Sequence, residues 1–298
     1  MSSYLEATAR QRLRGLLDPG SFEEFLPPQE RVVSPHLAQL DAPVAFDDGV
    51  AVGRARLDGV NVFAAAQEGG FMGGAVGEVH GAKLVGLLRR AIAERAPAVL
   101  LLLDTGGVRL HEANAGLIAV AEVMRAVLDA RAAGIPVLAL VGGANGAFGG
   151  MGIVARCANA VLMSEEGRLA MSGPEVIETA SGVEEYDARD RALVWRTCGG
   201  KHRYLLGDCQ TIVPDEVAAF RLAAIAALAA ARPGTVELTL EALENEHTLL
   251  SQRLARFGAL KDPQEIWATL GMPQAAGIPM LEIDNFIHAA AAHRLGAL

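Results

Sequence analysis

Two glycine-rich turns are the parts of this sequence with the clearest capacity for chemistry. The first turn contains Gly106 and Gly107, and the second, from residue 145 to 152, contains Gly149 and Gly150. Each follows an apolar run of strand length and opens a segment with helical spacing. The first amides of a helix lack intrahelical partners, and glycine lets a ligand oxygen approach them without meeting a Cβ. One N–H group from each turn could therefore form an oxyanion hole for a thioester oxygen.

Two other interpretations of these turns stay open. Gly-Gly after a strand also permits a tight connection to a helix, with no role in catalysis. In addition, Gly150-Met151-Gly152-Ile153-Val154-Ala155 fits the dinucleotide-binding pattern G-x-G-x-x-A, with Glu165 as a possible ribose ligand. The intervening helix would be short for that motif, and the acidic residue comes early. We favour the oxyanion interpretation because the two turns together carry more glycines than the connections require.

The elements that must position these turns repeat as strand, glycine turn and helix. This repeat predicts an α/β fold with a buried, mostly parallel sheet. Beyond Pro214 the pattern is almost entirely helical, so the sequence predicts a domain over residues 1–230 and a helical C-terminal extension over 231–298. The expected elements are a helix over 5–17, a hairpin over 50–56 and 60–66, helices over 77–95 and up to about 133, strands over 98–103, 135–141 and 160–163, and helices over 217–232, 236–256 and 281–295.

Composition narrows the class of protein. Hydrophobic residues make up 51% of the 298 residues, which allows a sizeable core. The net charge of −9 argues against a nucleic-acid partner. The apolar runs are too short or too rich in alanine to span a membrane, and the N-terminus lacks the apolar core of a signal peptide, so we expect a cytoplasmic protein. Cys157, Cys198 and Cys209 have no CxxC spacing and are expected to be packing residues, with no metal site.

Four segments resemble, in the same order, characteristic motifs of acyl-CoA carboxyltransferases. Residues 9–22 are similar to the opening helix and turn of that family, and FMGGAVG at 71–77 is similar to FMGGSMG. GGVRLHE at 106–112 resembles GGARMQE, and SGPEVIE at 172–178 resembles AGPRVIE. The resemblance covers about residues 9–215. It implies a crotonase-like ββα spiral, in which the second glycine turn is also similar to the crotonase oxyanion turn.

Three motifs of related enzymes are absent from this sequence, and their absence indicates which subfamily it resembles most. No cysteine precedes Cys157, so the four-cysteine zinc ribbon of bacterial acetyl-CoA carboxylase β subunits is absent from the sequence. No biotin-carrier motif is present either. The segment 151–155 has no carboxylate, unlike the corresponding helix of crotonase hydratases. The sequence therefore most resembles the β subunits of biotin-independent malonate decarboxylases.

This resemblance implies a reaction and a set of partners. The substrate would be a malonyl thioester on an acyl carrier protein with a phosphoribosyl-dephospho-coenzyme A-type prosthetic group. Loss of CO2 would leave an enolate whose charge the oxyanion hole stabilises. The chain itself would bind no cofactor and no biotin. Its expected partners are a homologous γ subunit, an α subunit that acts as acyl-carrier-protein transferase, and the acyl carrier protein.

Several further residues are candidates for substrate binding. Gly73 and Gly74 lie in the FMGG segment, and His80 follows it. His111 and Glu112 follow the first turn, and each of these two, or His80, could protonate the enolate carbon. Arg109 could hold a carboxylate or phosphate, or form a surface ion pair. The polar stretch 184–207, which contains Tyr186, Trp195, Lys201, His202 and Arg203, is interpreted as a lid or partner surface.

Two other functions remain as alternatives. The chain could be the β subunit of a biotin-dependent acetyl-CoA carboxyltransferase, or a non-catalytic scaffold subunit. Replacing Gly150 with Val is expected from the sequence to abolish decarboxylation while leaving folding and assembly intact.

Overall fold

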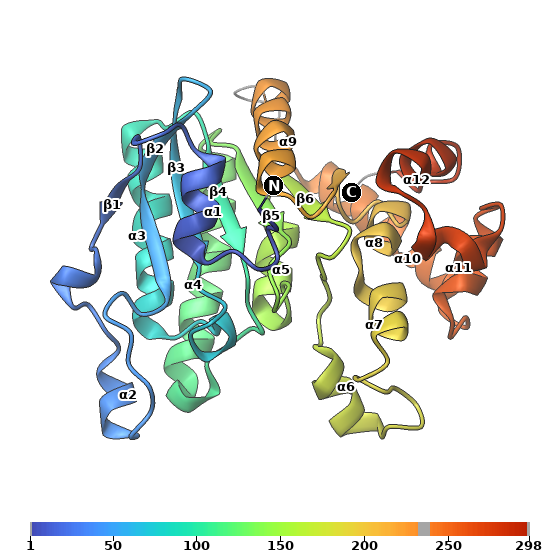
Figure 1. Cartoon of the computed structure of the whole chain (residues 1–298), viewed down its shortest axis with the longest axis horizontal. Coiled ribbons are helices and arrows are strands. Elements are labelled where there is room, and N and C mark those ends of the chain that lie inside the picture. The colour runs from blue at the N-terminus through green and yellow to red at the C-terminus, as the bar shows by residue number, and fades with distance from the viewer. Residues whose placement is uncertain (1, 232–238, 297–298) are drawn as a thin grey trace.

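One seven-stranded sheet runs through the centre of the chain. The structure, a computed structural model, describes residues 2–231 and 239–296. The strands follow one another in chain order across the sheet (Figure 1). The first three strands are antiparallel and the other pairs are parallel. The strands are β1 (Glu23–Phe25), β2 (Val50–Leu57), β3 (Val60–Gln67), β4 (Val99–Leu103), β5 (Val137–Val141), β6 (Ala160–Ser164) and β7 (Thr211–Val213).

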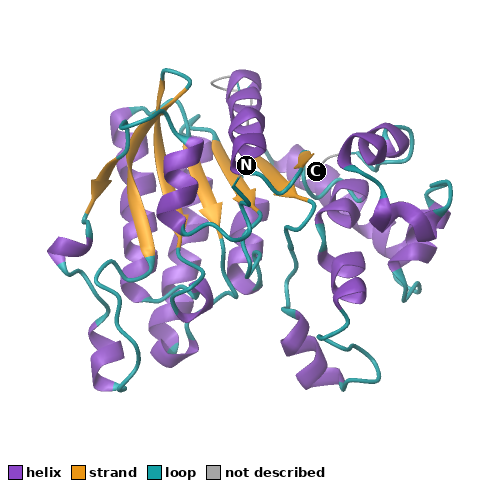
Figure 2. Cartoon of the chain, viewed as in Figure 1, coloured by secondary structure: helices purple, strands orange, loops and turns teal. Residues whose placement is uncertain are grey.

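Helices cover both faces of this sheet (Figure 2). On one face, the helices that follow β3, β4 and β5 enclose the larger core, which includes Leu84, Val123 and Met151. On the other face, the first helix of the chain packs beside the helix that follows β7. The helices of the first face are α3 (Glu78–Glu94), α4 (Asn114–Ala132) and α5 (Gly149–Cys157), and those of the second are α1 (Ala9–Leu16) and α9 (Val217–Ala230).

A second, much shorter ladder runs along the carboxyl ends of the parallel strands. Parallel bridges join Val76 to Val108, Thr105 to Ala147, and Ala147 to Leu169. Each repeating unit thus contributes a long strand, a short extended segment and a helix. This arrangement places the segments that follow β3, β4, β5 and β6 edge to edge.

The elements expected from the sequence are present, with shifted ends. The first helix begins at Ala9 rather than at residue 5, because Thr8 caps it in a reciprocal pair with Gln11. The sequence did not predict β1 and β7, each only three residues long. It also did not predict short helices between the named elements. These are α2 (Pro35–Gln39), α6 (Pro174–Ser181), α7 (Arg191–Cys198) and α8 (Gly200–Leu205), with one-turn helices η1 (Pro28–Glu30), η2 (Met72–Gly74) and η3 (Leu110–Glu112).

The C-terminal segment is helical, as expected. The predicted helices over 217–232 and 236–256 extend into residues 232 and 236–238, which lie outside the described residues. The last helix ends at Ala290 rather than 295. The division of the chain at residue 230 stays a prediction. The described elements are α10 (Leu240–Phe257), α11 (Pro263–Thr269), η4 (Ala275–Met280) and α12 (Ile283–Ala290).

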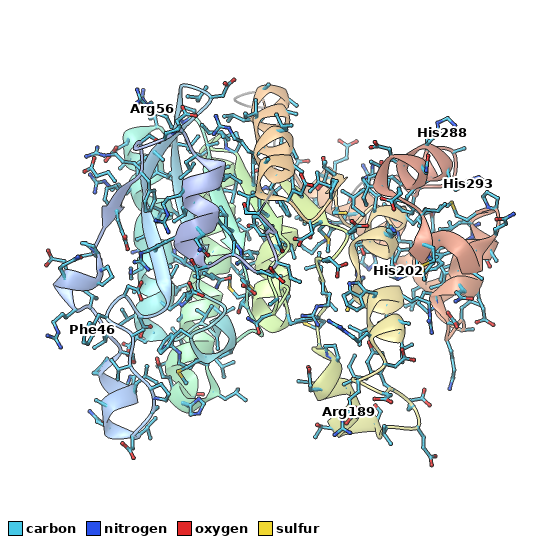
Figure 3. All side chains as sticks on the ribbon, in the orientation of Figure 1. Phe46, Arg56, Arg189, His202, His288 and His293 are labelled. Atoms are coloured by element: carbon cyan, nitrogen blue, oxygen red, sulfur yellow. The ribbon has the colours of Figure 1, made fainter. Side chains whose placement is uncertain are left out.

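The interpretation of residues 184–207 as a lid or partner surface is wrong for its second half. Helix α8 packs against the C-terminal segment, and His202 lies at this contact (Figure 3). The indole N–H of Trp267 donates to Nδ1 of buried His202 at 3.1 Å. The Lys201 ammonium donates to the carbonyls of Pro279 and Leu281. These side chains therefore hold the C-terminal segment in place.

Other expectations concern membranes and metals. Within the described residues, no helix combines the length and the apolar character needed to cross a membrane. Nor do those residues gather three His, Cys, Asp or Glu side chains into a possible metal site. Cys198 and Cys209 are buried, and burial raises the pKa of Cys209 to about 12, which suits a packing residue.

Substitution of Gly15 tests the packing of α1 against α9, and substitution of Gly86 on α3 serves as its control. A Cβ on Gly86, on the exposed side of α3, would meet no atom within 4 Å, whereas one on Gly15 would lie 2.7 Å from Cγ1 of buried Val217. We expect Gly86→Ala to raise the free energy of unfolding by about 0.5–1 kcal/mol through helix propensity. Gly15→Ala should lower it, because valine has few alternative rotamers. Thermal and urea unfolding would measure both, and a stabilising Gly15→Ala would contradict the close contact of α1 with α9.

Candidate functional site

The two glycine turns lie against each other. Thr105, the second residue after β4, donates its N–H to Gly146 O at 2.8 Å, and its carbonyl accepts the Phe148 N–H at 3.1 Å. A Cβ on Gly107 would lie 3.5 Å from Gly149 Cα, and one on Gly149 would lie 3.4 Å from Gly107 Cα. Both glycines have positive φ, 121° and 59° respectively. The backbones thus approach closely at a point where side chains on either residue would be strained.

Most of the amides expected to form the oxyanion hole already have acceptors. The Gly106 N–H donates to Gly73 O at 2.9 Å, and the Gly107 N–H donates to Thr105 Oγ1 at 3.0 Å. The Gly149 N–H donates to Met171 O at 2.8 Å. In this conformation, the expectation that Gly106, Gly107 or Gly149 presents a free N–H group is therefore wrong. These glycines shape the turns through their backbone conformation.

Two neighbouring amides do have the required freedom. Gly150 is the second residue of α5, whose first intrahelical bond to a preceding residue runs from Gly152 N–H to Phe148 O. No acceptor for the Gly150 N–H is found among the residues that the structure describes. The same holds for the N–H of Val108, although its neighbours Gly107 and Arg109 both bond to Val76. Val108 and Gly150 directly follow the close contact of Gly107 with Gly149, and both are half-buried.

The position of Gly150 changes one expectation from the sequence. A Cβ there would lie 2.5 Å from Cγ1 of buried Val120 on α4. Gly150→Val would therefore disturb the packing of α5 against α4. We therefore expect this variant to lose stability, in contrast to the expectation from the sequence, and it cannot test catalysis alone.

Arg109 and Glu112 belong to a buried ionic network. Nη1 of Arg109 lies 2.9 Å from Asp48 Oδ2 and 2.8 Å from Glu112 Oε1, and none of these side chains is exposed. Glu112 also accepts the Glu78 N–H at the start of α3. The alternative of a surface ion pair for Arg109 is therefore wrong. All the groups involved bind segments of this chain to one another, and they fasten the residues after the first turn to β2 and α3.

Two carboxyl groups of this network have opposite pKa shifts. Burial raises the pKa of Asp48 above its usual range, and the adjacent Arg109 opposes this only in part. Burial also acts to raise the pKa of Glu112, but hydrogen bonds from the Glu78 amide and Arg109 outweigh it, so that pKa is lowered. Asp48 also accepts the backbone amides of Ser34 and His80, so its higher pKa follows from the greater cost of its burial and not from a lack of hydrogen bonds.

His80 is fully buried in α3 and has partners on both ring nitrogens. Nδ1 lies 3.1 Å from Asp48 O, and Nε2 lies 3.1 Å from the Gln67 side-chain amide. Gln67 in turn accepts the Asp104 N–H at 3.2 Å. Burial lowers the pKa of His80 to about 3, so the ring is neutral near pH 7. The pattern fits a tautomer that donates from Nδ1 and accepts at Nε2.

Gly73, Gly74 and His111 are the remaining substrate-binding candidates. Gly73 and Gly74 have positive φ in η2, and Gly73 O accepts the Gly106 N–H. A Cβ on Gly74 would come within 1.8 Å of Asp104 O, so only glycine fits there. His111 on η3 is exposed, and none of the described residues hydrogen-bonds to its ring. It is the one proton-donor candidate whose side chain is free to reach a ligand.

Comparison with known proteins assigns the chain to a family. The carboxyl transferase domain family matches residues 6–225. The chain belongs to this carboxyl transferase family. A chain of a Pseudomonas malonate decarboxylase hetero-tetramer, solved in complex with malonate, is 40% identical over 95% of this chain and 98% of that one, with a TM-score of 0.76.

Curated relatives point in the same direction. The malonyl-S-ACP:biotin-protein carboxyltransferase of Malonomonas rubra is 39% identical over 99% of this chain and 97% of its own length. The acetyl-coenzyme A carboxylase carboxyl transferase subunit β of Fusobacterium nucleatum is 30% identical over 59% of both proteins. This carboxyl transferase is thus closely related to malonate decarboxylase subunits. The predicted α/β, crotonase-like fold class is confirmed.

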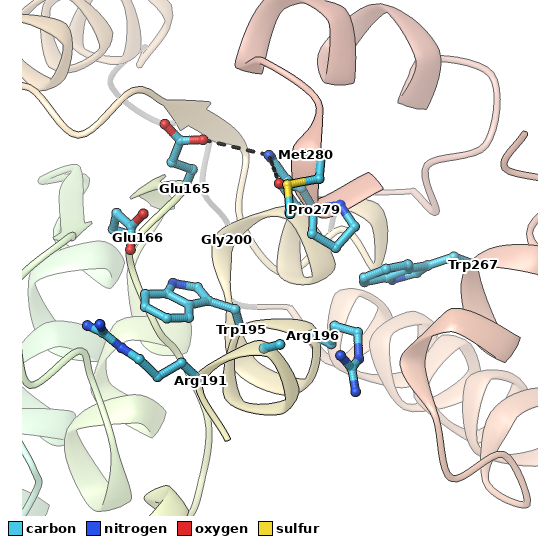
Figure 4. A pocket seen from close by; sticks show the side chains of 11 residues that line it. Glu165, Glu166, Arg191, Trp195, Arg196, Gly200, Trp267, Pro279 and Met280 are labelled. Atoms are coloured by element: carbon cyan, nitrogen blue, oxygen red, sulfur yellow. Dashed lines mark hydrogen bonds and ion pairs between the residues drawn. The ribbon is translucent and has the colours of Figure 1, made fainter. Parts of the chain in front are cut away.

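A pocket lies elsewhere on this carboxyl transferase. It has a volume of about 330 Å³ and opens between the end of β6, helices α7 and α8, and the C-terminal segment (Figure 4). Trp195 and Trp267 form apolar walls, and Lys201 pairs with Glu165 across it at 3.6 Å. None of its lining residues belongs to either glycine turn. It is therefore separate from the candidate site, which is a backbone feature and not an enclosed cavity.

Buried histidines give the stability of this protein a defined pH dependence. Burial keeps the folded-state pKa of both His80 and His202 below the ordinary histidine value of 6.5. Below about pH 6.5 the unfolded chain therefore binds protons that the folded chain does not, and stability is lost as the pH falls from there. We expect His80→Gln to flatten this loss, measured as the difference in Tm between about pH 7.5 and about pH 5.5. The matched control is His36→Gln, at an exposed ion pair with Glu78, and an equal loss in all three proteins would contradict the assignment.

Proposed function

We propose that this chain is the β-type subunit of a malonate decarboxylase. It would convert a malonyl thioester on an acyl carrier protein into the acetyl thioester and CO2. The Cα–carboxylate bond breaks, the carboxylate leaves as CO2, and the electron pair forms an enolate with its charge on the thioester oxygen. A proton then adds to Cα. The Val108 and Gly150 amides have no acceptor among the described residues, and each directly follows the contact of Gly107 with Gly149; this observation carries the proposal.

These amides suit a developing negative charge. Gly150 lies in the first turn of α5, where the helix dipole adds positive potential. Their neighbours are fixed by backbone bonds, so the donors are oriented before the reaction begins. Preorganised donors of this kind act mainly on the transition state and are each worth about 10²–10³ in kcat. The assignment moves the donors by one residue, from Gly107 to Val108, in the first turn, and keeps Gly150 in the second.

The roles of the polar candidates change as well. In this proposal His80, Arg109 and Glu112 support the turns and do not touch the substrate, because they are buried and their hydrogen bonds and ion pairs join neighbouring segments of the chain. His111 remains the proposed proton donor, directly or through water, because its ring is exposed beside the first turn. Gly73 acts through its carbonyl, which holds Gly106 in place.

Assembly with other subunits is also part of the proposal. Exposed apolar side chains lie next to the turns: Leu110, three residues after Gly107, is 80% exposed, and Met171, whose carbonyl accepts the Gly149 N–H, is 62% exposed. Contiguous exposed apolar surface is typical of protein interfaces. We infer that a homologous γ subunit covers this face and completes the site, and that the substrate arrives on an acyl carrier protein charged by an α subunit. The similarity to a chain of a Pseudomonas malonate decarboxylase hetero-tetramer supports this assembly. The carrier's prosthetic group, expected to be of the phosphoribosyl-dephospho-coenzyme A type, is part of the substrate.

A second candidate function differs only in the acceptor of the carboxyl group. The Malonomonas rubra relative is a malonyl-S-ACP:biotin-protein carboxyltransferase. In such an enzyme the same C–C bond breaks, but the carboxyl group passes to biotin on another protein. The paired amides would serve the enolate in both reactions.

Release of labelled CO2 from carboxyl-labelled malonyl thioester would distinguish the two functions. The chain is assembled with its homologous partner subunit, and the assay is run with and without avidin. Avidin-insensitive release is expected for the decarboxylase. Release that requires a biotinylated protein, and that avidin stops, would assign the chain to the biotin-dependent transferase.

The Val108 amide can be removed without removing an internal hydrogen bond. Val108→Pro deletes the N–H, whereas Val108→Ala shortens the side chain and keeps it. We expect Val108→Pro to lower kcat by about 100-fold with little change in KM, since the lost interaction strengthens only as charge develops. Val108→Ala should stay close to wild type. Circular dichroism confirms folding, and a folded Val108→Pro enzyme with full kcat would exclude this amide from the oxyanion hole.

A further inference from the structure

Asp104 joins the two turns through its side chain. It directly follows β4 and is 3% exposed. Its Oδ1 accepts the backbone N–H of Asn145 at 2.7 Å and the Asn145 side-chain amide at 3.2 Å. Because Asn145 begins the second turn, one carboxylate at the start of the first turn fixes where the second turn starts.

The other oxygen of Asp104 faces a buried cation. Nη1 of Arg12 on α1 donates to Oδ2 at 2.8 Å, and Arg12 is 1% exposed. The other two nitrogens of the Arg12 guanidinium, Nε and Nη2, donate to the carbonyls of Tyr4 and Leu5 respectively. The carboxylate is thus held from one side by α1 and holds Asn145 on the other.

Three glycines make room for Asp104, two beside its carboxylate and one beside its backbone carbonyl. A Cβ on Gly143 would lie 2.2 Å from Asp104 Cγ, and one on Gly69 would lie 2.4 Å from Oδ2. A Cβ on Gly74 would meet the Asp104 carbonyl oxygen. Backbone from the segments after β3 and β5 therefore closes on Asp104 without intervening side chains. This enclosure fixes the orientation of the carboxylate.

We propose that Asp104 is a positioning residue that sets the spacing between the two oxyanion amides. This inference rests on the proposed function. Asp104 does not touch the substrate. It holds Asn145, and through the short segment that follows it holds Gly150, against Val108. Without an acceptor for the Asn145 amide, the second turn would lose its fixed distance from the first, and the hole would loosen.

A matched pair of double variants separates this role from that of a simple counterion. Removing Asp104 alone would leave Arg12 as an unpaired buried charge, which is strongly destabilising. Both variants therefore also carry Arg12→Met, which replaces the cation with an apolar chain. Asp104→Asn with Arg12→Met keeps an oxygen for Asn145, and Asp104→Ala with Arg12→Met does not. Each is assembled with the homologous partner subunit and assayed for labelled CO2 release at a temperature where circular dichroism shows it folded.

We expect the Asn variant to retain kcat within about threefold of wild type. The Ala variant should lose about 100-fold in kcat, the effect of one oxyanion donor, with KM nearly unchanged. Equal kcat in the two folded variants would overturn the proposal, whether both are active or both inactive. A loss in the Ala variant that appears only in KM would overturn it as well.

Amide hydrogen exchange gives a readout that does not depend on activity. The segment 142–152 should exchange faster in the Ala variant than in the Asn variant, while residues 9–16 of α1 should behave alike in both. If the wild-type assembly released no CO2, the proposed function would fail, yet this comparison would still decide the positioning role. Equal exchange of 142–152 in the two variants would refute it.

Discussion

The backbone hydrogen bonds between the segments that follow β3, β4 and β5 determine where every other group of the site lies. Gly73 O holds Gly106, Val76 holds Gly107 and Arg109, and Thr105 holds Gly146 and Phe148. These bonds pair many of the backbone N–H and C=O groups at the ends of the strands. Within the described part of the chain, the amides of Val108 and Gly150 are among the donors that these bonds leave without an acceptor. The site is thus defined by which donors the ladder leaves without an acceptor.

Buried charges reinforce this ladder from both sides. Arg109 with Asp48 and Glu112 fastens the far end of the first turn, and Arg12 with Asp104 fastens its beginning. The uncharged chain of His80, Gln67 and the Asp104 backbone amide links the two groups. Buried ion pairs contribute little net stability, because desolvation offsets their attraction. Here most of these pairs join segments far apart in sequence, so their contribution is to geometry more than to stability.

The sequence predicted the repeating strands and helices because strand and helix periodicity are local properties. It also located the two turns, because glycine pairs after apolar runs are visible without a structure. It could not tell which amide of each turn is free, since this depends on acceptors such as Gly73 and Met171, 33 and 22 residues from Gly106 and Gly149 in the sequence. The sequence analysis did not select Asp104 or Asn145 as site residues. Each is a polar residue close to the end of a buried strand and next to a glycine turn, and this position was the signal that could have identified them. Arg109, His80 and Glu112 look like catalytic residues in sequence because burial and pairing cannot be read from residue type.

The contact of Arg12 with Asp104 has a consequence for how the protein is made. The two residues are 92 positions apart, and α1 itself packs on α9, where Arg221 bonds to Asp18 across 203 positions. During synthesis the first helix leaves the ribosome long before either surface exists. The Asp104 carboxylate, which joins the two turns, therefore lacks a firmly held counterion until α9 has been translated and α1 can dock. Such distant contacts form late and slowly, so an incomplete chain exposes a polar group that the finished protein never shows to water.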